Sequence, residues 1–138
     1  MITAGLTDSF KQQLLLGVHD FSTDTFKIAL YTSSATLGPT TTIYAAANEV
    51  SGTGYTATGL LLTNITVTLS QGIAYINFTN PAWPGSSFAT RGALIYNVTK
   101  SGKSVAVLNF GIDQTMVGQE FTIQLPANNP ETALIRIT

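Results

Sequence analysis

The sequence predicts an all-β protein, a jelly-roll-like antiparallel β-sandwich with one short N-terminal helix. Three observations lead to this fold class. Apolar and polar residues alternate with a period of two in several short segments, turn residues separate these segments, and helical periodicity occurs once, near the N-terminus. The chain has 138 residues, the length of one domain, so we expect a single domain over 1–138 with the sandwich over about 25–138.

The helix is predicted over about residues 8–16. Thr7 can cap it, and Asp8 places a negative charge in the first turn, where the helix dipole favours one. One apolar stripe is formed by Phe10, Leu14 and Leu15. Gly17 then ends the helical pattern.

About seven or eight short strands are predicted after the helix. Between the first and second strands, residues 33–59 are rich in Thr, Ser and Gly, and only part of this segment is expected to pair, at a sheet edge. Residues 80–87 are expected to form a loop. The strand segments are 26–31, 65–69 and 73–78 joined by a hairpin turn, 93–98 and 104–110 joined across 100–103, 121–125, and 134–138.

Two of these segments, Ile73–Phe78 and Val105–Phe110, are apolar on both faces. A strand in a two-layer sandwich needs only one buried face, so something must cover the second. The N-terminal helix, the 33–59 segment and another subunit are the alternatives.

Charged residues make up only 9% of the chain, whereas a typical soluble domain has roughly 25%. Charge keeps monomers apart, so its scarcity indicates a surface that is covered in use, by copies of the chain or by a larger scaffold. The six cations form no basic stripe, so no nucleic-acid partner is expected. Met1–Leu6 lacks the cationic start and long apolar stretch of a secretory signal, and Leu14–Leu16 is too short to span a membrane, so we expect synthesis in a cytoplasm and no membrane partner.

Candidate catalytic residues are few, and we expect no enzyme, no cofactor and no metal site. The chain has no cysteine, and its one histidine, His19, follows the helix end, where a surface or capping role is expected. The seven carboxylates show no calcium-loop spacing. Gly52 and Gly54 indicate a turn rather than a phosphate site.

Aromatic residues are the remaining candidates for a binding role. Trp83 and Tyr75 are possible interface anchors, since buried aromatic residues often dominate interfaces. For Trp83 the alternative is a plug that closes one end of the sandwich.

Several segments of the chain resemble a family of small virion proteins of tailed bacteriophages. The segments that carry the resemblance are Asp24–Ser33, Asn48–Tyr55, Arg91–Asn97 and Ala106–Gly111, and their order and spacing match nearly the whole length. Within that family, the chain is most similar to the cement, or decoration, proteins of podovirus capsids.

The resemblance implies a jelly-roll protein that forms a homodimer on the outer surface of an icosahedral capsid. Its partners would be the major capsid protein and a second copy of itself, and it would stiffen the head. The alternative is a tail or fibre module that recognises a host receptor, which should display aromatic residues around a carbohydrate-sized groove. A small hydrolase, which needs convergent titratable groups, is the third hypothesis.

Glu49 and Arg91 are isolated charges within two of the segments that carry the resemblance. A partly buried charge requires an opposite one, so we predict that they form an ion pair within the subunit. The alternative is that both are solvated.

Overall fold

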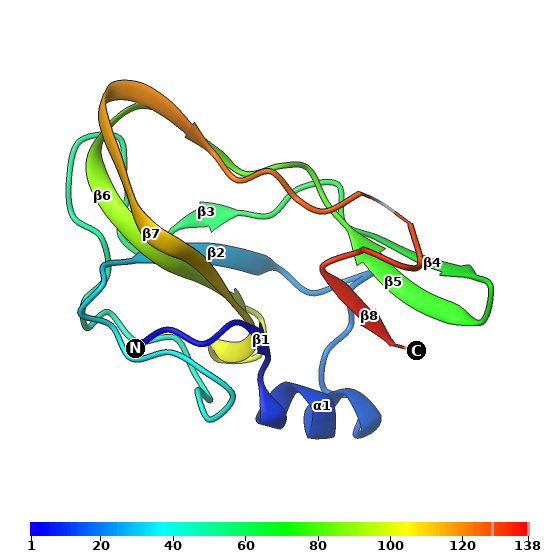
Figure 1. Cartoon of the computed structure of the whole chain (residues 1–138). Helices are drawn as coiled ribbons and strands as arrows, with labels where there is room; N and C mark the ends of the chain where they lie inside the picture. Colours follow the sequence, from blue (N-terminus) through cyan, green and yellow to red (C-terminus); the bar gives the residue numbers. More distant parts are fainter. Residues whose placement is uncertain (128, 138) are drawn as a thin grey trace.

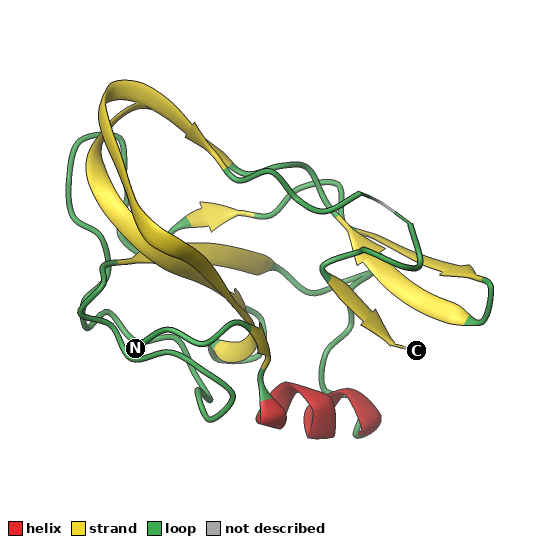
Figure 2. Ribbon diagram, in the orientation of Figure 1, coloured by secondary structure: helices red, strands yellow, loops and turns green. Residues whose placement is uncertain are grey.

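The computed structural model describes residues 1–127 and 129–137, which form two antiparallel sheets and one helix (Figures 1 and 2). The antiparallel β-sandwich with one short N-terminal helix is therefore confirmed. The larger sheet has five strands, in the order β1 (Gly5–Leu6), β7 (Lys103–Thr122), β6 (Ala82–Asn97), β2 (Phe26–Tyr31) and β3 (Leu60–Leu61). The smaller has three, in the order β4 (Thr66–Ser70), β5 (Ile73–Asn77) and β8 (Ile135–Ile137).

The helix α1 (Asp8–Leu15) begins and ends as the sequence predicts, to within a residue. The Thr7 hydroxyl caps it by accepting a hydrogen bond from the Phe10 N–H at 3.4 Å. Gly17 follows with a φ of 71°, a conformation that most other residues avoid. Phe10 is 1% exposed and anchors α1 to the main core.

The predicted hairpin of the smaller sheet is confirmed. Gln71 and Gly72 join β4 to β5 with φ angles of 54° and 76°, the two positive values of a tight hairpin turn. The predicted strand 134–138 is found as β8, and Thr138 lies outside the described residues.

The most prominent element is the β6–β7 hairpin, with strands of 16 and 20 residues. The loop expected at residues 80–87 is wrong, because β6 already begins at Ala82 and pairs with β7 there. Pro84 and Gly85, which indicate a loop in the sequence, lie at an irregularity between Trp83 and Ser86 that the ladder tolerates. Further shifts in register bend the hairpin, which arches back over the core in Figure 1.

The second face of the larger sheet is covered by the chain itself. Its own apolar core consists of Ile2, Ala29, Tyr31, Ala35, Leu37, Leu94, Tyr96 and Val107. Residues 33–59 and the first residues of the chain cover this face. A segment without regular structure therefore buries the second face of the sheet, as a further layer of helices or strands would. The partial pairing expected for this segment consists of four isolated bridges: Tyr31–Glu49, Ile43–Lys103, Thr53–Ser87 and Ile2–Leu37.

Gly59 is placed where this cover meets β2. A Cβ at this position would lie 2.8 Å from the Ala29 Cα and also against the Ile28 carbonyl, and its φ is 90°. We expect Gly59→Ala to lower the free energy of unfolding by about 2–4 kcal/mol. Urea unfolding measures this, with Gly38→Ala as the control, because a Cβ there would come no closer than 3.5 Å to Thr3. Equal losses in the two variants would contradict the prediction.

Candidate functional site

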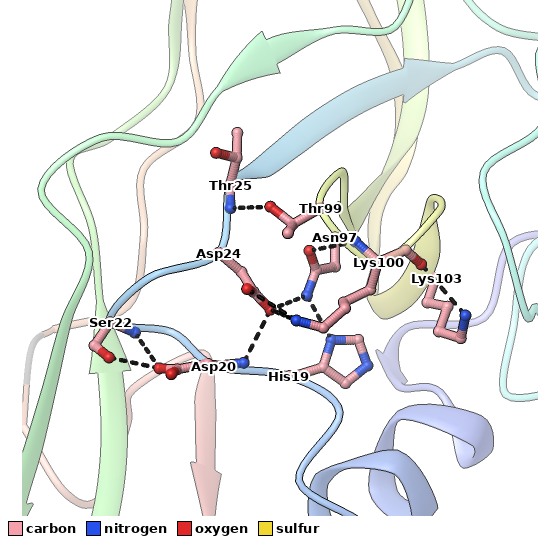
Figure 3. Close-up of polar contacts among 9 residues, drawn as sticks. All are labelled: His19, Asp20, Ser22, Asp24, Thr25, Asn97, Thr99, Lys100 and Lys103. Carbon is pink, nitrogen blue, oxygen red and sulfur yellow. Dashed lines mark hydrogen bonds and ion pairs between the residues drawn. The ribbon is translucent and has the colours of Figure 1, made fainter.

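A cluster of polar side chains gathers around Asn97, at the end of β6 (Figure 3). Asn97 is fully buried, and its amide nitrogen donates hydrogen bonds to His19 Nδ1 at 3.0 Å and to Asp24 Oδ2 at 2.9 Å. Its amide oxygen accepts from the backbone N–H of Lys100 at 3.2 Å. We call His19, Asp24, Asn97 and Lys100 the clasp, because they tie the tip of the β6–β7 hairpin to residues 18–25.

Asp24 supplies the negative charge of the clasp. Its side chain is 4% exposed and receives the Lys100 ammonium at 3.1 Å and the Asp20 N–H at 3.1 Å. Burial by itself would raise the pKa of Asp24, but the hydrogen bonds from Asn97, Asp20 and Lys100 and the Lys100 charge outweigh it and hold the pKa below its usual value. Asp24 therefore stays ionised at neutral pH and holds the hairpin tip.

His19 is buried, with 6% of its surface exposed, so the expected surface or capping role is wrong. Its ring lies 5.0 Å from that of Phe10 and 6.4 Å from that of Phe26, and Nε2 is 2.9 Å from the Gln13 Oε1. Burial lowers the pKa of His19, Asp24 opposes this, and Lys100 and Lys103 add to it. The physical reason for the error is that residues 18–25 fold back over α1, and no local pattern indicates that.

A second polar cluster surrounds Glu49. Its carboxylate accepts hydrogen bonds from the Tyr44 hydroxyl at 2.6 Å, from the Tyr55 hydroxyl, and from the Thr58 N–H at 2.9 Å. Burial and the bonds to Glu49 raise the pKa values of Tyr44 and Tyr55, so both are neutral donors. These bonds join distant parts of the 33–59 segment to each other, and Tyr31 adds a bond to the Ala45 carbonyl at 2.7 Å.

The predicted Glu49–Arg91 ion pair is wrong. Arg91 instead pairs with Asp113 across the hairpin, with 2.9 Å between Nε and Oδ1, in a bridge whose side chains are 34% and 48% exposed. An exposed pair of this kind adds little stability. The Glu49 carboxylate accepts its hydrogen bonds from neutral hydroxyl and backbone N–H donors. A search for a residue of opposite charge does not find such partners.

Neither candidate anchor is available to a partner. Trp83 is 3% exposed and stacks on Phe121 with 5.7 Å between ring centroids, as the plug alternative requires. Tyr75 is 8% exposed. The possible anchor role of both side chains is therefore corrected: within the subunit they are already buried.

Apolar side chains are exposed on the smaller sheet instead. Val67 pairs with Ile76, Leu69 pairs with Ala74, and Ala74 pairs with Ile137, so alternation places these five side chains of β4, β5 and β8 on one face. We call this the open face, because it is only partly covered. The exposed fractions on it are 59% for Val67, 75% for Leu69 and 51% for Ile137.

Two hollows accompany these surfaces. A small one of about 100 Å³ lies where the open face meets α1, and Leu14, Val67 and Ala74 help to line it. A larger groove of about 600 Å³ runs along β1 and β7, with Phe110, Phe121 and three side-chain amides in its lining. No residue in the lining of the larger groove is charged.

Comparisons with known proteins find no relative. No protein-family model matches the sequence, and neither a curated protein nor a solved structure matches it. Residues 1–127 and 129–137 contain no group of three or more His, Cys, Asp and Glu side chains that could hold a metal ion. The helix in this described part lacks the length and apolar character needed to cross a membrane. The fold and its surfaces thus define an all-β sandwich with uncovered apolar side chains.

We expect Glu49→Gln to destabilise the fold by about 1–3 kcal/mol. The amide NH₂ of glutamine cannot accept, so it leaves a tyrosine hydroxyl or the Thr58 N–H without its acceptor. Urea unfolding measures the change. The matched control is Glu120→Gln, an exposed carboxylate whose hydrogen bond from the Thr122 hydroxyl is 3.2 Å long. A loss no greater than that of the control would show that the Glu49 cluster is not structurally important.

Proposed function

We propose that this chain is a structural virion protein, a cement or decoration protein that binds the outer surface of a phage capsid and stabilises contacts between major capsid subunits. The open face is the observation that carries the proposal. Three large aliphatic side chains, Val67, Leu69 and Ile137, are each more than half exposed there. In a chain with 9% charged residues, little charge is available to keep such a surface away from a partner.

The size of the open face favours a weak contact that is repeated many times. Complete burial of one Val, Leu or Ile side chain contributes about 1.5–3 kcal/mol. Three such side chains are already partly covered, so they contribute less than three times this amount. Their total does not exceed the roughly 4–15 kcal/mol that association costs over most of that range. One contact would therefore be short-lived, whereas contacts held together by a lattice reinforce one another.

A homodimer would use this principle directly. Two copies present two open faces, so both ends of the dimer can contact the shell, and the second contact forms at high effective concentration. In this proposal the chain catalyses no reaction and takes no cofactor.

The alternative function, a tail or fibre module that binds a host receptor, would use the larger groove. Its volume is about 600 Å³, and Phe110 and Phe121 lie in its lining. Two of its amides are already bonded, however: Asn109 to the Ile2 carbonyl and the Gly111 N–H, and Gln124 to Asn80. A sugar needs several free hydrogen-bonding groups, so this lining suits a sugar poorly.

A pair of lysine substitutions on β4 tests the cement proposal. Leu69 lies on the open face and Thr68 on the opposite face of the same strand, and both are exposed. We expect Leu69→Lys to abolish co-sedimentation with purified heads of the virus that encodes the chain, because the contact would bury an unpaired charge. Thr68→Lys should bind as the unchanged chain does.

Equal binding by the two variants would exclude the open face as the contact. If the unchanged protein binds host cells and not tail-free heads, the receptor alternative replaces the proposal.

A further inference from the structure

The clasp fixes the proton positions of its members. Because the Asn97 amide oxygen accepts from the Lys100 N–H, the Asn97 NH₂ must face His19 Nδ1 and Asp24. His19 Nδ1 is then an acceptor, so the proton of the neutral ring is on Nε2, where it is donated to the Gln13 Oε1 at 2.9 Å. The three hydrogen bonds of the Asn97 amide therefore fix which of its atoms donate and which accepts.

We propose that the clasp is an acid-operated latch, in which a proton taken up at His19 Nδ1 removes an acceptor of the Asn97 amide and weakens the attachment of the β6–β7 hairpin tip to residues 18–25, while the Asp24–Lys100 ion pair remains. This inference goes beyond the proposed function and does not depend on it. The bond that is lost joins His19 to Asn97, which is fully buried at the end of β6.

A rearrangement of Asn97 cannot relieve the conflict. If its amide rotated to offer oxygen to the protonated ring, the same oxygen side would face the Asp24 carboxylate, and the NH₂ would face the Lys100 N–H. Both new contacts would be repulsive. The ring also has little contact with water, because only 6% of His19 is exposed.

The charges around His19 do not favour its cationic form. Residues 18–25 present Asp24 to it, and the hairpin presents Lys100 and Lys103. The neighbours from α1 are Gln13 and Phe10, and the neighbour from β2 is Phe26, none of which carries a charge. Asp24 is already paired with Lys100, so it offers limited compensation to a second cation.

The pH range of the latch follows from the direction of the shift. The pKa of His19 is lowered in the folded state from its ordinary value of 6.5, so the folded state loses stability as the pH falls below 6.5. The pKa of Asp24 is lowered from 3.8, so its ion pair with Lys100 persists to more acid pH. Between pH 6.5 and pH 3.8, His19 is therefore the member of the clasp whose charge changes.

The consequence is local opening of the hairpin tip. Val98 donates to the Thr25 carbonyl at 2.8 Å and Thr25 donates to the Thr99 hydroxyl at 2.8 Å, so these two amides report whether the tip is attached. The Tyr44 N–H also donates to the Gly102 carbonyl at 2.8 Å, which connects the tip to the 33–59 segment. Opening therefore also loosens the cover of the second face.

Nuclear magnetic resonance tests the latch directly, because the chain has a single histidine. We expect ¹⁵N shifts to show the proton on Nε2 at about pH 7.5, and the imidazole to titrate below 6.5. Between about pH 7.5 and about pH 5, hydrogen-exchange protection of the Val98 amide should fall several-fold. Protection of the Ile123 amide, which donates to the Pro81 carbonyl away from the clasp, should not change.

The variant His19→Gln keeps an uncharged polar side chain that takes up no proton in this range. Its Val98 protection should be independent of pH after correction for intrinsic exchange. Three results for the unchanged protein would exclude the latch. These are a His19 pKa at or above 6.5, a neutral His19 ring with its proton on Nδ1, and an equal loss of hydrogen-exchange protection at the Val98 and Ile123 amides. These outcomes are read from the unchanged protein, so they hold even if the variant does not fold.

Discussion

The structure depends on one constraint: the half of the β6–β7 hairpin that lies next to its tip is buried on both of its faces. Gly92–Asn97 and Ser104–Val107 are buried at every position, so this part of the hairpin needs cover on both sides. Bending at the register shifts lets its far half supply Trp83, Phe88, Met116 and Phe121 to the same core that its near half lines. The second face is left for irregular chain to cover, since the only helix among the described residues packs elsewhere.

A segment without regular structure needs other polar contacts to hold it in place, because its backbone lacks the regular hydrogen bonds of a sheet. The clasp and the Glu49 cluster provide them, and each contains a carboxylate that accepts several hydrogen bonds. Asp24 and Glu49 are thus two of only seven acidic residues, and both serve inside the subunit. Asp24 and Glu49 thus form polar contacts between segments of the same chain. The exposed side chains of the open face are apolar.

The sequence predicted the elements whose signal is local. The helix followed from Thr7 and the apolar stripe, and the β4–β5 hairpin from period-two alternation around Gln71 and Gly72. Residues 80–87 were mispredicted because Pro84 and Gly85 have the same local signature in a loop and at an irregularity in a ladder. Only the pairing of Ala82 with Thr122, far along the chain, distinguishes the two.

The polar clusters could not be predicted for a related reason. His19 and Asn97 are 78 positions apart, and the donors to Glu49 are tyrosines and a backbone N–H rather than an opposite charge. Residue types indicate which groups need partners, whereas the bends of the hairpin decide which partners they meet. The resemblance to virion cement proteins concerns function and likewise remains a proposal.

The pairing of β1 with β7 has a consequence for how the chain folds. Gly5 pairs with Val107, and Asn109 donates to the Ile2 carbonyl, so the first residues stay without these neighbours until β7 has left the ribosome. Contacts between such remote positions carry a large loop-closure entropy and slow the search for the native state. Completion of the larger sheet therefore waits for β7, and until then the first residues leave a strand edge of that sheet unpaired.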